Sequence, residues 1–322
     1  MANFFCTELS QTAGEDLIGT ADNAPIYVFI QCPPPWQRQI IDSPHIPAAV
    51  KADYLQLLSE LQSSQITVRF GFIHHLAADN HIRVLIFRQP TGFASRYHPQ
   101  EFHLSKLTEV IPLLRSCLLE HHPSSLPIDI PNRHIFICTH GSYDKCCAHY
   151  GNIFYRQAVA IVKNLDLHHL RIWQCTHFGG HRFAPTAIDF PQGRFYGRLT
   201  PESFRQILTQ TGDIQELIKV YRGWAILPQP AQIVERELIK QFGWDWLNYQ
   251  VQYQVIASTN NPQISRINLI YQNSAQIRGS YEAEVWQTID NACSLPLSCE
   301  SEATAKTSWH CQVIPTLSYS TT

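Results

Sequence analysis

Cys138-Thr-His-Gly-Ser-Tyr-Asp-Lys-Cys-Cys147 and Cys175-Thr-His-Phe-Gly-Gly-His-Arg-Phe-Ala-Pro185 are the two stretches that indicate the fold and the chemistry of this chain. A short apolar run precedes each stretch, Ile135 to Ile137 in the first case and Leu170 to Trp173 in the second. Such runs are typical of buried strands, so both stretches are predicted to be loops that leave the ends of strands. Side chains from the two loops are therefore expected to converge at one edge of a sheet.

Four residues in these loops are candidate metal ligands: Cys138, Cys147, His177 and His181. Thiolates suit zinc and iron-sulfur centres, and imidazole suits zinc and iron, so this set restricts the metal to a short list. Cys146 competes with Cys147 for the second position. Neighbouring cysteines cannot easily both reach one metal ion with ordinary backbone geometry, so one of the two is predicted to be structural.

The two histidines are separated by Phe178-Gly179-Gly180. A glycine pair breaks a helix, so this is not the zinc-protease arrangement in which two histidines share one helical face. The glycines instead allow a tight loop in which both rings turn toward one metal. Arg182 is expected to offset the negative charge of the thiolates or to pair with an acid such as Asp144; the alternative is an ordinary surface arginine.

Composition limits the possible classes of protein. The chain has 322 residues, enough for two or three domains, and a formal net charge of -2 with 16% charged residues. This balance gives no reason to expect nucleic acid or an anionic membrane surface as a partner. No leader segment or membrane-spanning run is recognisable, so we expect a cytoplasmic protein. In a chain of this length the ten cysteines are expected to be reduced thiols or metal ligands rather than a disulfide framework.

The hydrophobic pattern predicts an α/β protein in which one order of elements, strand, helix, strand, strand, helix, occurs twice. That order is typical of a thioredoxin-like unit. Beyond these units, a helix over 232–242 ends at Gly243 and short strands are expected at 249–256, 266–271, 283–288 and 309–314. The predicted division is an N-terminal thioredoxin-like unit (1–126), a metal-binding thioredoxin-like domain (127–228), which the family resemblance described below identifies with a ferredoxin domain, and a C-terminal helix with a small antiparallel β region (229–322).

The sequence resembles the sucrase/ferredoxin-like family, whose members are thioredoxin-like ferredoxins. The resemblance is carried by the motifs Cys138-Thr-His-Gly, Asp144-Lys-Cys-Cys-Ala148, Thr176-His-Phe-Gly-Gly-His-Arg-Phe-Ala-Pro185 and Pro191-Gln-Gly-Arg-Phe-Tyr-Gly197.

The resemblance implies a 2Fe-2S cluster held by two cysteines and two histidines outside the Rieske fold. The family's cysteine pair falls on Cys138 and Cys147, and its histidine pair falls on His177 and His181. Tyr143 stands where the family often has an arginine.

The family name also suggests sucrose cleavage, which the residues do not support. Glycoside hydrolysis needs two carboxylates held across a sugar, and the loops and their surroundings supply only Asp144 and Asp189. We therefore predict an electron-transfer or redox-sensing protein with redox protein partners. Two alternatives remain: a structural zinc site in an interaction module, and a thiol-dependent enzyme in which Cys138 or Cys147 is paired with His140 or His177.

Overall fold

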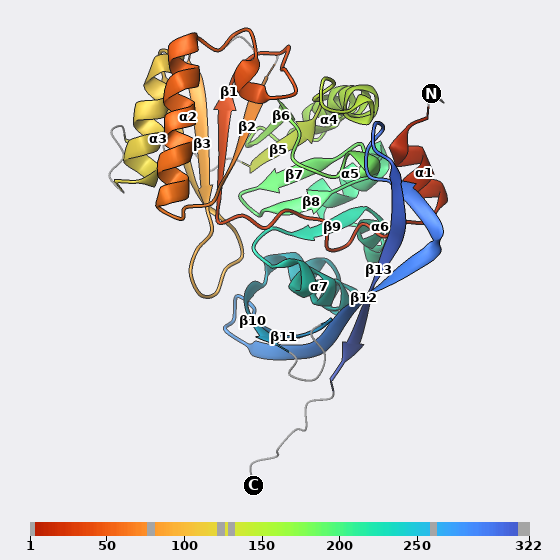
Figure 1. The fold of residues 1–322 in the computed structure, drawn as a ribbon. Helices are drawn as coiled ribbons and strands as arrows, with labels where there is room; N and C mark the ends of the chain where they lie inside the picture. Colours follow the sequence, from red (N-terminus) through yellow and green to blue (C-terminus); the bar gives the residue numbers. More distant parts are fainter. Residues whose placement is uncertain (1–3, 76–80, 121–125, 128–132, 258–262, 315–322) are drawn as a thin grey trace.

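The computed structural model describes residues 4–75, 81–120, 126–127, 133–257 and 263–314. A mixed sheet of nine strands runs through the molecule in the order β4-β3-β1-β2-β6-β5-β7-β8-β9. A separate antiparallel sheet of four strands, β10-β11-β12-β13, lies at the C-terminal end (Figure 1). The predicted α/β class with a C-terminal antiparallel region is therefore confirmed.

The first half of the large sheet is built around β1, which pairs in parallel with β2 and antiparallel with β3. Helices α2 and α3 pack on one face of these strands (Figure 1). The elements of this half are β1 (Ile26–Gln31), α2 (Ala48–Ser63), β2 (Val68–His74), β3 (Ile82–Arg88), β4 (His98–Leu104) and α3 (Val110–Leu118).

The second half repeats this arrangement around β5, which pairs in parallel with β6 and antiparallel with β7. The strand order β8-β7-β5-β6 thus matches β4-β3-β1-β2. Its elements are β5 (Arg133–Cys138), α4 (Asn152–Asn164), β6 (Leu170–Cys175), β7 (Ala187–Phe190), β8 (Arg194–Tyr196), α5 (Pro201–Thr209), α6 (Ile214–Val220) and β9 (Tyr221–Trp224).

The two halves join through a short antiparallel pairing of β2 with β6, at Ile73↔Cys175 and His74↔Gln174. They also share a core, because Phe29 of β1 stacks on Phe136 of β5 with ring centroids 4.1 Å apart. Burial on both faces explains why these strands are continuous apolar runs. Since one sheet crosses both halves, the domain boundaries expected near residues 126 and 228 stay predictions.

The first half contains one strand more than the sequence indicated, β4, and the second half contains two, β8 and β9. Strand β4 is an edge strand, His98-Pro-Gln-Glu-Phe-His-Leu104, whose polar residues and proline give no strand signal. Proline is tolerated there because one side of an edge strand makes no ladder hydrogen bonds. Strand β8 has three residues, too few for a periodic pattern.

The C-terminal region begins with α7 (Gln229–Phe242), which ends at Gly243 as expected. The strands β10 (Gln250–Ala257), β11 (Ile264–Gln272), β12 (Arg278–Pro296) and β13 (Ala303–Val313) follow. Strand β12 is much longer than predicted, and its hairpin with β13 runs back toward the N-terminal helix α1 (Cys6–Thr12) (Figure 1). The hairpin loop, residues 297–302, thereby reaches the predicted metal-binding loops.

Candidate metal centre

Two of the predicted ligands are placed by the junction between β5 and α4. Cys138 is the last residue of β5, and Cys147 opens a single turn of π-helix, Cys147–Gly151, that leads into α4. This turn passes so close to the strand end that a Cβ on Gly151 would lie 1.9 Å from the carbonyl oxygen of Cys138. Only glycine permits that approach, which brings the two cysteines to one place.

The loop after β6 supplies the imidazoles. The Nδ1 atom of His177 lies 3.8 Å from the Sγ atom of Cys138 and 3.6 Å from that of Cys147. The ligand atoms of these three residues all lie within 4.8 Å of one another. His181 lies on the far side of His177, with its Nδ1 atom 3.3 Å from the Nε2 atom of His177. The structure thus brings together all four predicted ligands, three in one tight group and His181 beside it.

The site is buried at its sulfur end and partly open at its imidazole end. Cys138 and Cys147 are each 1% exposed, whereas His177 and His181 are half-buried. Tyr143 stacks on His177 with ring centroids 3.9 Å apart. The Nε2 atom of His181 lies 2.5 Å from the carbonyl oxygen of Leu297, so this nitrogen carries a proton and donates it to the hairpin loop.

The two thiols act as an unequal acidic pair. Burial opposes ionisation of Cys138, but its hydrogen bonds with Cys147 and His177 outweigh this effect and lower its pKa. The hydrogen bond with Cys138, together with burial, raises the pKa of Cys147. One proton therefore leaves the pair easily and the second is held firmly. A metal cation that replaces the second proton removes this penalty.

His140 has a positioning role. Its Nδ1 atom accepts a hydrogen bond from the backbone N–H of His177 at 3.2 Å, and its Nε2–H donates to the carbonyl oxygen of Gln37 at 2.9 Å. Both ring nitrogens are thus occupied by backbone groups. This arrangement disfavours His140 as the base of a thiol-dependent enzyme and instead fixes the start of the histidine loop.

Cys146 does not join its neighbour. Its Sγ atom lies 3.5 Å from the Sγ atom of Cys6 and 3.3 Å from that of Cys299. Neither Cys6 nor Cys299 was indicated by the sequence, because residues so distant along the chain leave no spacing pattern. Leu297 was likewise not indicated by the sequence.

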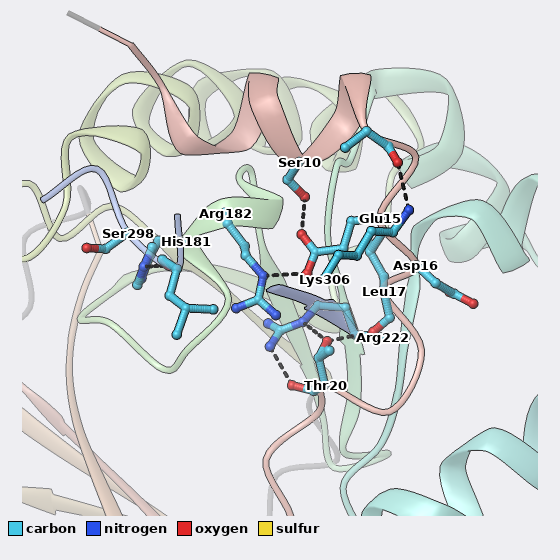
Figure 2. A network of polar contacts seen from close by, with 12 residues as sticks. Ser10, Glu15, Asp16, Leu17, Thr20, His181, Arg182, Arg222, Ser298 and Lys306 are labelled. Atoms are coloured by element: carbon cyan, nitrogen blue, oxygen red, sulfur yellow. Dashed lines mark hydrogen bonds and ion pairs between the residues drawn. The ribbon is translucent and has the colours of Figure 1, made fainter. Parts of the chain in front are cut away.

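Arg182 is not paired with Asp144. Its Nε atom donates to Glu15 at 2.8 Å, and Glu15 also accepts from Ser10 (Figure 2). The expectation of an Asp144 partner is therefore wrong, because the segment after α1 supplies a nearer carboxylate. The ion pair fixes this N-terminal segment to the turn that carries His181.

A cavity of about 490 Å³ opens beside His177 and is lined on one side by the glycine loop. Arg222, which is 2% exposed, donates to the carbonyl oxygens of Gly179 and Thr20, and burial lowers its pKa to about 10. A Cβ on Gly180, which has φ of +80°, would lie 2.5 Å from the guanidinium carbon of Arg222. Gly180 is thus needed for the arginine beneath it as well as for the turn.

The family model described as Sucrase/ferredoxin-like matches residues 17–223, which include all four predicted ligands. The chain belongs to the sucrase/ferredoxin-like family. This membership confirms the resemblance seen in the sequence.

A further similarity is to "Altered inheritance of mitochondria protein 32" of Meyerozyma guilliermondii, 32% identical over 101 residues. That match spans 30% of this chain and 36% of the relative. No solved structure matches the chain. Among the described residues, no helix has both the length and the apolar character needed to cross a membrane.

Proposed function

We propose that this protein binds a 2Fe-2S cluster through Cys138, Cys147, His177 and His181 and uses it to transfer electrons or to sense redox conditions. The observation that carries the proposal is the order of ligand atoms in space. Two thiols lie on the Nδ1 side of His177, and the ring of His181 lies on its other side. Two sulfur ligands at one end and two imidazoles at the other suit a two-iron centre with different ligands on each iron.

The chemistry of the donor set fits the group. Both thiols are buried, and they form the unequal acidic pair that a cation would stabilise. A cluster held there would supply a one-electron couple. Cys138 and Cys147 would hold it on the buried side, while the half-buried histidines would form the side nearer to a redox protein partner.

The polypeptide keeps these ligands in place through contacts to the backbone. His140 bonds the backbone N–H of His177, Tyr143 stacks on the ring of that histidine, and Leu297 accepts a hydrogen bond from His181. Contacts of this kind orient ligands and influence the centre they hold. We place the protein in the cytoplasm as part of the same proposal.

A zinc site is the second candidate. It is favoured by the tight grouping of Cys138, Cys147 and His177 without His181, since zinc accepts three protein ligands and a further one from solvent or protein. An enzyme that cleaves sucrose is not proposed. Asp144 and Asp189 do not face a common space, because Asp144 binds backbone amides near Cys146 and Asp189 pairs with Arg133.

Purification under anaerobic conditions from iron-replete cells separates the two candidates. The iron-sulfur proposal expects a coloured protein with two irons and two sulfides per chain, and loss of both in a His177→Ala, His181→Ala variant. A matched control is His168→Ala, since His168 is exposed and lies outside the metal-binding loops. Colourless protein that contains neither iron nor sulfide overturns the proposal, and zinc that is lost from it in the His177→Ala, His181→Ala variant favours the zinc site.

A further inference from the structure

Three cysteines from distant parts of the chain form a triangle beside the candidate centre. The Sγ atoms of Cys6 and Cys146 are 3.5 Å apart, those of Cys146 and Cys299 are 3.3 Å apart, and those of Cys299 and Cys6 are 3.5 Å apart. Cys6 and Cys146 have no exposed surface. The three residues belong to α1, to the loop after β5 and to the loop between β12 and β13.

A buried carboxylate completes the group. Asp144 is 4% exposed, and its side-chain oxygen atoms accept hydrogen bonds from the backbone N–H of Cys146 at 2.8 Å and of Cys299 at 3.0 Å. One ligand atom of each of these four residues lies within 4.8 Å of those of the others. A carboxylate oxygen that accepts one hydrogen bond retains a second lone pair, so Asp144 can position two of the cysteines and also act as a ligand.

A backbone donor and an apolar shell surround the sulfur triangle. The backbone N–H of Cys6 donates to the Sγ atom of Cys299 at 3.4 Å. The side chains of Phe5 and Ala184 pack around the triangle and limit solvent access to it. The ammonium group of Lys145 lies 5.1 Å from the centre of the Phe5 ring, which places a positive charge at the edge of this apolar shell.

The distances between the sulfurs suit a metal better than a disulfide. A disulfide bond needs sulfurs roughly 2 Å apart and uses only two of them. Tetrahedral zinc with Zn–S bonds of about 2.3 Å needs sulfurs about 3.8 Å apart, which is close to all three distances here. Zinc also accepts carboxylate oxygen, and its structural sites are closed by four protein ligands.

We propose that Cys6, Cys146, Cys299 and Asp144 form a second metal centre, which binds one zinc ion and joins helix α1 and the β12–β13 loop to the loop of the first centre. Binding replaces the thiol protons: one Zn²⁺ enters, three S–H bonds break, three Zn–S bonds form and up to three protons leave to solvent. No electron is transferred. The inference stands independently of which metal group the first centre holds.

The first test is the metal content of anaerobically purified full-length protein from zinc-sufficient medium. We expect one zinc per chain in the wild type and a loss of at least tenfold in Cys299→Ser, with iron content unchanged. Cys293→Ser is the matched control, because Cys293 lies in the same hairpin but outside the sulfur triangle. Zinc retained in Cys299→Ser, with a normal circular dichroism spectrum, overturns the proposal.

A second measurement does not depend on the folding of that variant. Zinc X-ray absorption of Cys147→Ser protein, in which the first centre is disabled, is expected to show three sulfur neighbours at about 2.3 Å and one lighter ligand. Fewer than three sulfurs, or mass spectrometry that finds Cys6 joined to Cys146 or Cys299 by a disulfide, contradicts the proposal.

The two centres fail in distinguishable ways. Iron absent from every preparation, with zinc still lost in Cys299→Ser, rejects the proposed iron-sulfur function and supports the second centre. Wild-type protein that contains iron but no zinc supports the iron-sulfur function and rejects the second centre. Zinc lost only in Cys147→Ser places the zinc at the first centre and rejects the second.

Discussion

Adjacent residues in this chain serve different groups of ligands. The Sγ atom of Cys147 faces His177 at 3.6 Å, whereas the Sγ atom of Cys146 faces Cys299 at 3.3 Å. Successive side chains project in different directions at the start of a helical turn, so one short motif reaches both groups. The sequence argument that one of two neighbouring cysteines serves another purpose agrees with this arrangement, although which of them binds iron remains a prediction.

Serine substitutions of Cys146 and Cys147 are expected to have opposite effects on the metal content. Cys147→Ser should abolish iron binding, because a hydroxyl is a poor substitute for a thiolate ligand. Cys146→Ser should keep the iron and lose the zinc. Metal analysis of both variants alongside wild-type protein checks the prediction. Retention of iron in Cys147→Ser together with its loss in Cys146→Ser would exchange the two assignments.

The histidines are expected to set the reduction potential. If His177 and His181 are ligands, replacing both by cysteine should lower the potential, because thiolates add negative charge and imidazole ligands raise it. Burial lowers the pKa of His181. Reduction adds negative charge beside the rings and raises their pKa. The wild-type potential should therefore fall as pH rises from the ring pKa of the oxidised protein to that of the reduced protein.

Voltammetry over a pH series on the wild type and the double variant checks this prediction. The double-cysteine protein, provided that it assembles its centre, should show a lower potential with little pH dependence. A cluster-loaded wild-type protein whose potential is flat well above and below the ring pKa values counts against histidine ligation with accessible protons.

At the scale of single elements, the sequence was most informative where burial gives the hydrophobic residues a regular spacing. The strand at Leu170 to Trp173 and the helix that ends at Gly243 were predicted and are present as β6 and α7. The π-turn at Cys147–Gly151 was not predicted. No periodic signal marks it, because its conformation follows from the close approach of Gly151 to β5.

That approach makes Gly151 sensitive to the smallest substitution. In Gly151→Ala the new methyl group would overlap the carbonyl group of Cys138, so the turn must shift and carry Cys147 away from Cys138. We expect a loss of roughly 2–4 kcal/mol in the free energy of unfolding, as for other overpacked sites, and reduced metal content. Val159→Ala, on the exposed side of α4, is the control and should change both quantities little.

At the scale of the whole molecule, a charge network holds the two halves of the sheet together. Glu101 of β4 is 5% exposed and accepts hydrogen bonds from Arg83 at 2.5 Å and from Arg171 of β6 at 2.8 Å. His103 lies 2.8 Å from the same carboxylate. Burial opposes the charge of Glu101, but its hydrogen bond with His103 and the neighbouring arginines lower its pKa to about 2.

The low pKa of Glu101 determines how its contribution to the free energy of unfolding changes with pH. The folded pKa of Glu101 lies below its unfolded value of about 4.3, so its contribution is complete above that value and is lost as pH falls toward 2. Glu101→Gln should lower the free energy of unfolding by on the order of 2 kcal/mol at pH 7, and the difference from wild type should shrink in acid.

Urea unfolding at pH 7 and at pH 3 measures both parts of the prediction for Glu101. The matched control is Glu300→Gln, since Glu300 and its partner Arg38 have side chains 71% and 57% exposed, and exposed ion pairs contribute little. A Glu101→Gln effect of equal size at both pH values argues against the charge as its cause.

Two segments that are distant in the sequence meet at the metal-binding loops, a long-range feature that the sequence did not reveal. Helix α1 and the β12–β13 loop flank them, as Figure 1 shows. Lys306 of β13 donates to the carbonyl oxygen of Ala13 at 2.9 Å, and Arg182 bonds to Glu15 (Figure 2). Further hydrogen bonds join these segments, among them Thr7 to the carbonyl oxygen of Ala184 and the backbone N–H of Cys299 to Asp144. A metal at the sulfur triangle would add a link shared by all three segments.

Removal of a metal from the sulfur triangle is expected to loosen helix α1 and the β12–β13 loop and to leave the large sheet intact. A zinc chelator should increase amide hydrogen exchange in residues 4–12 and 297–302, because these segments lose their shared ligand, while β1 and β5 in the common core stay protected. Cys299→Ser should show the faster exchange without chelator and respond little to its addition, and Cys293→Ser should behave as wild type. Exchange that accelerates equally in β5 and in residues 4–12 and 297–302 would indicate global unfolding. Unchanged exchange in all of them would show that polar contacts alone hold residues 4–12 and 297–302.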